Sequence, residues 1–320
     1  MADHENSSNE HAAEGAAAHH GESHAPAHVG DPLAPEHLFG HVQDSTEFHV
    51  PERLRTHWTI PQPFPHYRET PLTAANPELH LAPIDLQVTK FMVLEVVAAL
   101  VMVVLFVPLA RRVTDGSRPR GRLANLLETF LVFLRDQVAR PAIGGHDADK
   151  YLPFLWTMFF FVFGCNLLGL LPWLGSPTAA LAVTGTLALM TFLVVIGSGM
   201  AKMGIVGFWK GLVPHMELPW ILAIFLLPMI FAIELLGLLI KHGILAIRLL
   251  ANMVAGHLVL AVLVAFILAS NRTLAWYGVA PASVLGSSAL MLLELFVAFL
   301  QAYIFTFLSA LFIGMAVHPH

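Results

Sequence analysis

The chain has 320 residues, 56% of them hydrophobic and only 12% charged, and its mean hydropathy is +0.68. A soluble domain usually carries about 25% charged residues, so the composition argues for a protein embedded in a bilayer. The net charge of −5 and the lack of a basic tract interleaved with aromatic residues argue against nucleic acid as a partner. The single cysteine, Cys165, has no partner for an intrachain disulfide.

Residues 1–50 are a His-rich segment of low complexity, and we expect them to form a disordered, weakly buffering tail. Twelve of the 18 histidines precede position 81, and His20, His24 and His28 are spaced four apart. That spacing would suit metal binding on a helix, which is the alternative interpretation, but glycines and prolines interrupt the run. Residues 51–85 contain seven prolines and are predicted to be a polar approach to the membrane. We expect no cleavable signal peptide, because this region lacks a long apolar core.

Residues 86–320 are predicted to be the membrane domain, with a first span at about 88–110. Roughly twenty-three residues at 1.5 Å each are enough to cross a hydrocarbon core of about 30 Å. Five arginines follow between positions 111 and 122, and they predict a cytoplasmic loop with the N-terminus outside. The next segment, 123–139, is predicted to be an amphipathic helix on the cytoplasmic surface. Its expected apolar face comprises Leu126, Leu127, Phe130, Leu131, Phe133 and Leu134.

Four further spans are expected at about 152–172, 178–200, 219–268 and 284–317. The span at 219–268, with about fifty mainly apolar residues, is too long for one upright crossing, so we expect it to be steeply tilted, kinked or broken. Its candidate weak points are Pro228, Gly237, Gly243 and Gly256. The sequence thus predicts an all-α polytopic membrane protein with about five transmembrane helices. Two of these, at the C-terminal end, are long and tilted, and the chain ends in the cytoplasm.

Ionisable residues inside a membrane are costly and are functional candidates by default. Glu234, Lys241 and Arg248 are spaced by seven residues, which is two helical turns, so they share one stripe of a helix. Asn252 lies one turn beyond Arg248, and His257 lies about 180° round the helix from it. One face would therefore present a permanent cation, and the opposite face a titratable imidazole.

On the last predicted span, Glu294 and Gln301 are also seven residues apart and lie on one face. Each ionisable candidate has a simpler structural interpretation. Lys241 would snorkel to the cytoplasmic interface, and Glu234 would pair with it or lie at an interface. Arg248 would belong to a structural ion pair, His257 would be a hydrogen-bonded core histidine, and Glu294 would be a lone structural carboxylate.

Three segments carry a resemblance to a known family. Residues 247–263 resemble the signature helix of subunit a of F-type ATP synthases, and they read IRLLANMVAGHLVLAVL. Residues 293–312 are similar to the last helix of that family and read LELFVAFLQAYIFTFLSALF, while 166–173 match an earlier element as NLLGLLPW. The resemblance covers about 88–317 and is closest to members with His after the Ala-Gly pair and Glu on the last helix; other bacterial members exchange the two. Gly169 stands where some relatives have an acid, so it has no place in the expected mechanism.

The resemblance implies a stator subunit that passes protons to and from a carboxylate on each subunit of a rotating c-ring, through two half-channels. The residues to which it gives a role in proton translocation are Arg248, His257, Glu294, Asn252, Gln301, Glu234 and Lys241. The arginine would face the rotor, the His–Glu pair would line the outer half-channel, and the Asn and Gln would lie near the rotor. The Glu–Lys pair of the long helix would border the inner half-channel.

The same resemblance implies a subunit that is not catalytic by itself and that uses no cofactor. Its partners would be the c-ring, the peripheral-stalk b subunits and the lipid bilayer, and its place would be the bacterial cytoplasmic (inner) membrane. A stand-alone ion transporter is one alternative, but it would often show internal repeats, and we find none. A His-dependent membrane metalloenzyme is another, but twelve of the 18 histidines lie before the first predicted span.

Overall fold

The computed structural model describes residues 44–45, 47–48, 58–61, 88–114, 121–171, 174–212, 220–271 and 273–318. The predicted tail, 1–50, and the predicted approach segment, 51–85, therefore lie largely outside the described residues. In the parts of them that are described, β1 (Glu47–Phe48) pairs antiparallel with β2 (Trp58–Thr59). The remaining elements are helical, which confirms the all-α class; the two-residue strands were not expected.

Five helices are long and apolar enough to cross a membrane, as the sequence predicts. They are α3 (Lys90–Thr114), α6 (Gly145–Gly169), α7 (Leu181–Met203), α9 (Trp220–Ser270) and α10 (Trp276–Val317). They expose many large apolar side chains, above all on α3, α9 and α10. Water would not tolerate such extensive apolar surface, so the chain is a multi-pass membrane protein.

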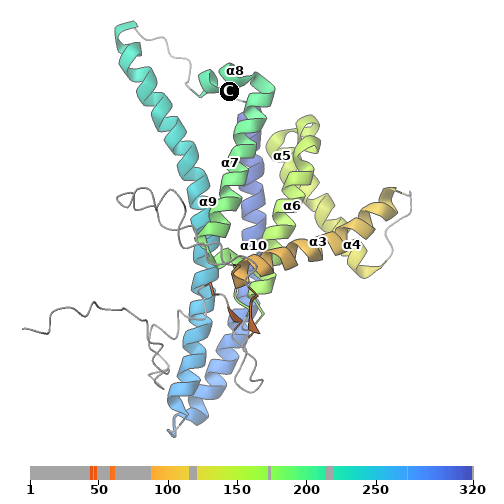
Figure 1. Ribbon diagram of the computed structural model, residues 1–320, viewed down its shortest axis with the longest axis vertical. Helices are drawn as coiled ribbons and strands as arrows, with labels where there is room; N and C mark the ends of the chain where they lie inside the picture. The colour runs from red at the N-terminus through yellow and green to blue at the C-terminus, as the bar shows by residue number, and fades with distance from the viewer. Residues whose placement is uncertain are drawn as a thin grey trace, which may run out of the picture. The chain divides into compact units, whose positions relative to one another are not determined.

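The longest of these helices, α9, has 51 residues and runs without interruption through Pro228 and the glycines that were candidate breaks. At 1.5 Å per residue it is about 75 Å long, more than twice a hydrocarbon core of about 30 Å. The alternative of a broken helix is therefore wrong, and α9 has to be strongly inclined in a bilayer. The 42-residue α10 packs along α9, and α6 and α7 run in a similar direction, whereas α3 crosses them (Figure 1).

Short helical segments connect the long helices. α4 (Arg122–Phe133) continues into a π-helical turn, η2 (Leu134–Ala139), and then into α5 (Arg140–Ile143), which leads into α6. The 3₁₀ turn η3 (Pro177–Ala179) precedes α7, and α8 (Ile205–Gly211) follows it. Among the successive long helices, α7 packs against α9, and α9 packs against α10.

The segment expected to be an amphipathic surface helix, 123–139, forms α4 and η2 but is only partly exposed. Leu126 is 52% exposed, whereas Leu134 and Val138 are fully buried in the core formed with α6 and α10. Part of the expected lipid-facing side is thus covered by protein, because η2 packs against those two helices. On the polar side, Asp136 accepts a hydrogen bond from Arg135 with an Nε–Oδ1 distance of 2.9 Å. That hydrogen bond lowers the pKa of the Asp136 carboxyl.

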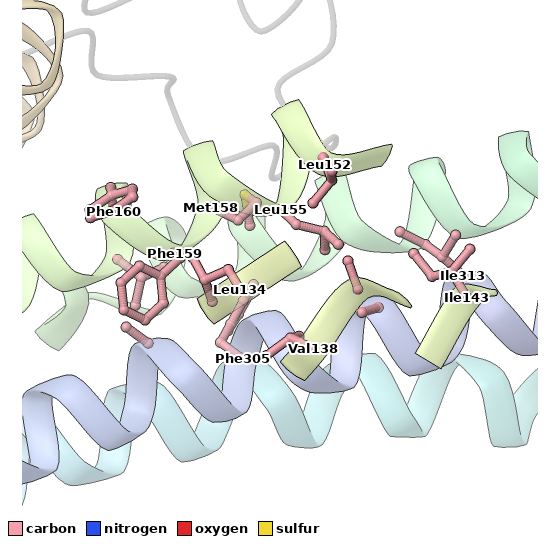
Figure 2. Close-up of a cluster of buried hydrophobic side chains, with 14 of the residues drawn as sticks. Leu134, Val138, Ile143, Leu152, Leu155, Met158, Phe159, Phe160, Phe305 and Ile313 are labelled. Carbon is pink, nitrogen blue, oxygen red and sulfur yellow. The ribbon is translucent and has the colours of Figure 1, made fainter. Parts of the chain in front are cut away.

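The main hydrophobic core lies where η2, α5, α6 and α10 meet (Figure 2). Leu134 from η2, Phe159 from α6 and Phe305 from α10 lie close together in Figure 2, and all three are fully buried. At one crossing, a Cβ on Gly314 would overlap the carbonyl oxygen of Ala142, so α10 and α5 meet backbone to backbone. This core fixes α10, and the polar residues that it carries, relative to α6.

Candidate functional site

Arg248 lies at the border between the packed and exposed faces of α9. It is half-buried and follows the fully buried Leu245, while Ile247 beside it is 59% exposed. Among the described residues, no group forms a hydrogen bond or an ion pair with its guanidinium. The permanent cation is therefore presented next to an exposed apolar surface without a counter-ion from the described part of its own chain.

His257 and Glu294 meet across α9 and α10. The Nδ1 atom of His257 lies 2.9 Å from the carbonyl oxygen of Met253 and 3.3 Å from Oε1 of Glu294. Nδ1 points toward the carbonyl, so the approach to Glu294 is an ion-pair contact rather than an aligned hydrogen bond. The other ring nitrogen, Nε2, lies 3.0 Å from the carbonyl oxygen of Gly169 on α6. We call these two side chains and the Gly169 carbonyl the His257 site.

Every group that meets the His257 ring nitrogens is an acceptor: two backbone carbonyls and one carboxylate. A neutral imidazole has one N–H and donates to one of them, whereas a doubly protonated ring donates on both sides. Glu294 is 8% exposed, so its carboxylate has little access to solvent to balance its charge. The imidazole and this buried carboxylate therefore face each other across the two helices, with 3.3 Å between Nδ1 and Oε1.

Two glycines make this arrangement possible. A Cβ on Gly256 would lie 2.6 Å from Oε1 of Glu294, so the glycine of the Ala-Gly pair leaves room for the carboxylate. A Cβ on Gly169 would lie 2.8 Å from both Cε of Met253 and Oγ of Ser176. Position 169 thus has no space for the acid that some relatives carry, and its backbone carbonyl contacts His257 instead.

Asn252 on α9 and Gln301 on α10 form a hydrogen bond between the two helices. The Asn252 Nδ2 donates to Oε1 of Gln301 at 2.8 Å. Gln301 is 3% exposed, and its Nε2 has no partner among the described residues. Because Asn252 lies one turn from Arg248, this bond extends the polar groups of α10 toward the guanidinium.

Sequence reasoning missed a polar cluster beside the His257 site. Thr178 donates to Oδ1 of Asn166 at 2.8 Å, and its hydroxyl lies 2.7 Å from that of Ser176. Asn166 in turn donates to the Ala298 carbonyl at 3.3 Å, and all three side chains are buried. Asn166 lies within the NLLGLLPW segment, whereas Ser176 and Thr178 gave no signal in the sequence because both residue types are common in helix-connecting turns.

The remaining two predicted residues, Glu234 and Lys241, lie elsewhere on α9. Both line a cavity of about 150 Å³ among α7, α8, α9 and α10. The other walls include Leu238, Phe208 and Phe312. We call this the Lys241 cavity. Glu234 and Lys241 are both exposed, and they do not form an ion pair with each other.

Arg248 therefore lies between two polar regions on one helix. It is seven residues, about 10 Å, from Lys241 and nine residues, about 14 Å, from His257 along the axis. In the described part of the chain, no group of three or more His, Cys, Asp or Glu side chains is arranged to hold a metal ion. The candidate site consists of a fixed cation, Arg248, with ionisable side chains on either side of it along α9.

Comparison with known proteins identifies the family. The family model described as ATP synthase A chain matches residues 92–314. The chain is 39% identical over 283 residues to the ATP synthase subunit a of Myxococcus xanthus, a match that covers 88% of each chain. It is also 39% identical over 245 residues to ATP synthase subunit a of Chloroherpeton thalassium, which covers 75% of this chain and 70% of the relative. The chain therefore belongs to the ATP synthase subunit a family.

Proposed function

We propose that this subunit translocates protons as part of the stator, through two half-channels that end on opposite sides of Arg248. Family membership makes the chain part of an ATP synthase complex. The observation that carries the finer proposal is the state of Arg248, which has no partner among the described residues and lies between the His257 site and the Lys241 cavity. The proposed role is transport, and the subunit has no catalytic function by itself.

Arg248 acts on a carboxyl group that a partner subunit brings to it. A rotor carboxyl in lipid stays protonated, because burial disfavours its charged form; beside a guanidinium it ionises. Arg248 cannot lose its own proton, so it forces each arriving carboxyl to release one and blocks direct proton passage between the half-channels. The exposed apolar stripe beside it, which includes Ile240 and Ile247, suits a lipid-facing c-ring helix.

The His257 site and its neighbours form the outer half-channel in this proposal. Glu294 takes up a proton and shares it with Nδ1 of His257 at 3.3 Å. The hydrogen-bonded side chains of Asn252 and Gln301 then extend the proton path from the His257 site toward Arg248. The buried cluster around Asn166 supplies further hydroxyl and amide groups next to the site. The Lys241 cavity forms the inner half-channel, with Glu234 as its proton-exchanging group.

Helix lengths support the orientation that we propose. α3 is about 37 Å long at 1.5 Å per residue, close to the thickness of a bilayer core, so it spans the membrane directly. Because α9 and α10 are longer and run across α3 (Figure 1), they lie strongly inclined beside the c-ring. Arg111 and Arg112 at the end of α3 support a cytoplasmic position for that end, by the positive-inside rule. The N-terminus is then outside and the C-terminus inside a bacterial cytoplasmic membrane, where the b subunits are further partners.

The proposal is tested by ATP-driven proton pumping in inverted membrane vesicles that carry Arg248→Ala. We expect pumping to be lost while the complex still assembles at the wild-type level. The matched control is Arg140→Ala, which removes an arginine that is ion-paired to Asp136 away from the site, and it should pump normally. Normal pumping by an assembled Arg248→Ala complex would contradict the mechanism and reopen the transporter interpretation.

A further inference from the structure

His242 is a buried ionisable residue that the mechanism above does not use. It lies on α9 directly after Lys241 and is 2% exposed. Its Nδ1 lies 2.8 Å from the carbonyl oxygen of Leu238. A carbonyl only accepts hydrogen bonds, so Nδ1 carries the proton of this bond and donates it.

The second ring nitrogen of His242 has a different environment. Nε2 is buried and has no hydrogen-bond partner among the described residues. With the proton on Nδ1, Nε2 of the neutral ring bears a lone pair that can accept a proton or a hydrogen bond from water. Buried polar atoms are normally satisfied, so this nitrogen requires an explanation.

His242 does not itself line the Lys241 cavity, but three of its neighbours do. Leu238, which accepts its hydrogen bond, lines the cavity, and so does Lys241, its neighbour in sequence. Phe312, whose ring centroid lies 4.9 Å from the imidazole, is a third shared wall. The cavity volume of about 150 Å³ is enough for several water molecules, each of which occupies about 30 Å³ in the liquid.

The charges around the imidazole come from α9 itself. The described ring neighbours on the packed helices are aromatic, namely Phe192 on α7 at 5.3 Å and Phe312 on α10. Lys241, the preceding residue on α9, is charged, and Glu234 lies two turns back along the wall of the cavity. His242 is thus a buried imidazole behind the wall of the Lys241 cavity, and Arg248 is six residues, or about 9 Å, further along the helix.

We propose that His242 is a proton relay of the inner half-channel, accepting protons at Nε2 from water in the Lys241 cavity and returning them there. This inference rests on the proposed function, because it assigns a residue to one of the two half-channels. In the direction of ATP synthesis, a proton released near Arg248 passes to Nε2, and the imidazolium then gives it to cavity water near Glu234. The imidazole ends each cycle neutral, so no net charge stays on it.

The first test uses His242→Gln, which keeps a polar side chain but does not titrate. We measure ATP-driven pumping, and passive proton flux between pH 5.5 and 8, in vesicles with equal amounts of assembled complex. A positioned proton-transfer group contributes about 10²-fold or more, so we expect flux to fall at least about tenfold and to lose its imidazole-dependent pH response. The matched control is His146→Gln, the same change at an exposed histidine, and it should leave both unchanged.

The second test is chemical rescue of His242→Ala. Imidazole added to the vesicles should restore part of the lost flux, whereas pyrrole, a ring of the same size without a basic nitrogen, should not. Wild-type flux and pH response in His242→Gln would overturn the proposal. So would reduced flux with an unchanged pH response and no rescue, or failure of every His242 variant to assemble, because each result assigns a packing role. Arg248→Ala separates the two levels: if it pumps normally, the proposed function fails; if it is inactive while His242→Gln pumps normally, only the relay fails.

Discussion

Gly256→Ala is expected to disable the His257 site while leaving the helix pair intact. The added Cβ would lie 2.6 Å from Oε1 of Glu294 and 3.0 Å from its Cδ, whereas an ordinary contact begins at about 3.4 Å. The carboxylate must therefore retreat by about 0.8 Å, which lengthens its 3.3 Å approach to Nδ1 of His257. A misplacement of about 1 Å can cost about 10²-fold in rate, so we expect proton flux to fall by between ten- and a hundredfold.

The assay is ATP-driven quenching of a pH-sensitive dye in inverted vesicles, normalised to assembled complex. Gly243→Ala is the matched control, since it makes the same change on α9 at a position where nothing lies within 4 Å of the new Cβ. It should pump normally and gain up to about 1 kcal/mol in helix stability. If Gly256→Ala pumps as well as Gly243→Ala, the 3.3 Å contact does not limit proton transfer and the reasoning is refuted.

Two further predictions concern packing and hydrogen bonding. A double-mutant cycle with Asn252→Ala and Gln301→Ala should show coupling of about 0.5–1.5 kcal/mol in thermal unfolding of the detergent-solubilised complex, because the 2.8 Å bond joins these side chains; additive effects would mean that the bond contributes nothing. Gly314→Ala should cost about 3 kcal/mol or more and reduce assembled subunit, since its Cβ overlaps the rigid carbonyl of Ala142. The same change at Gly197 of α7, where no atom lies within 4 Å, should be tolerated, and equal assembly of the two variants would contradict the backbone contact.

The sequence predicted the helices well where hydrophobicity alone decides and less well where packing does. The five long apolar helices could be predicted from composition, because a membrane-spanning helix needs about twenty consecutive residues that are predominantly apolar. The course of α9 did not follow, since proline and glycine in a long apolar segment are compatible with a break, a kink or a continuous tilted helix. Leu134 has the same apolar character whether it faces lipid or protein, so the burial of η2 between α6 and α10 could not be predicted from it.

The candidate site shows the same division between one helix and several. The spacing of Glu234, Lys241 and Arg248 predicted their shared stripe, because it depends only on helical geometry. The contact of His257 with Glu294 depends on how α9 and α10 pack, and the sequence supported it through resemblance rather than spacing. His242 adjoins Lys241 but was not singled out, since its burial beside Phe312 and its unpartnered Nε2 become visible only when α10 is in place.

The unequal pairing of polar groups along α9 is itself an argument about assembly. His257 has three acceptors within 3.3 Å, and Asn252 is bonded to Gln301. Arg248, the one permanent cation among these three, has no counter-ion among the described residues although an uncompensated charge in the bilayer is expensive. Packing within the subunit could have supplied a carboxylate, as it does for His257. A partner subunit that approaches the exposed face of α9 can supply a carboxylate as the counter-ion of the guanidinium. If that carboxylate moves away again, the guanidinium becomes free to meet the next one. A carboxylate fixed within the subunit would prevent this exchange.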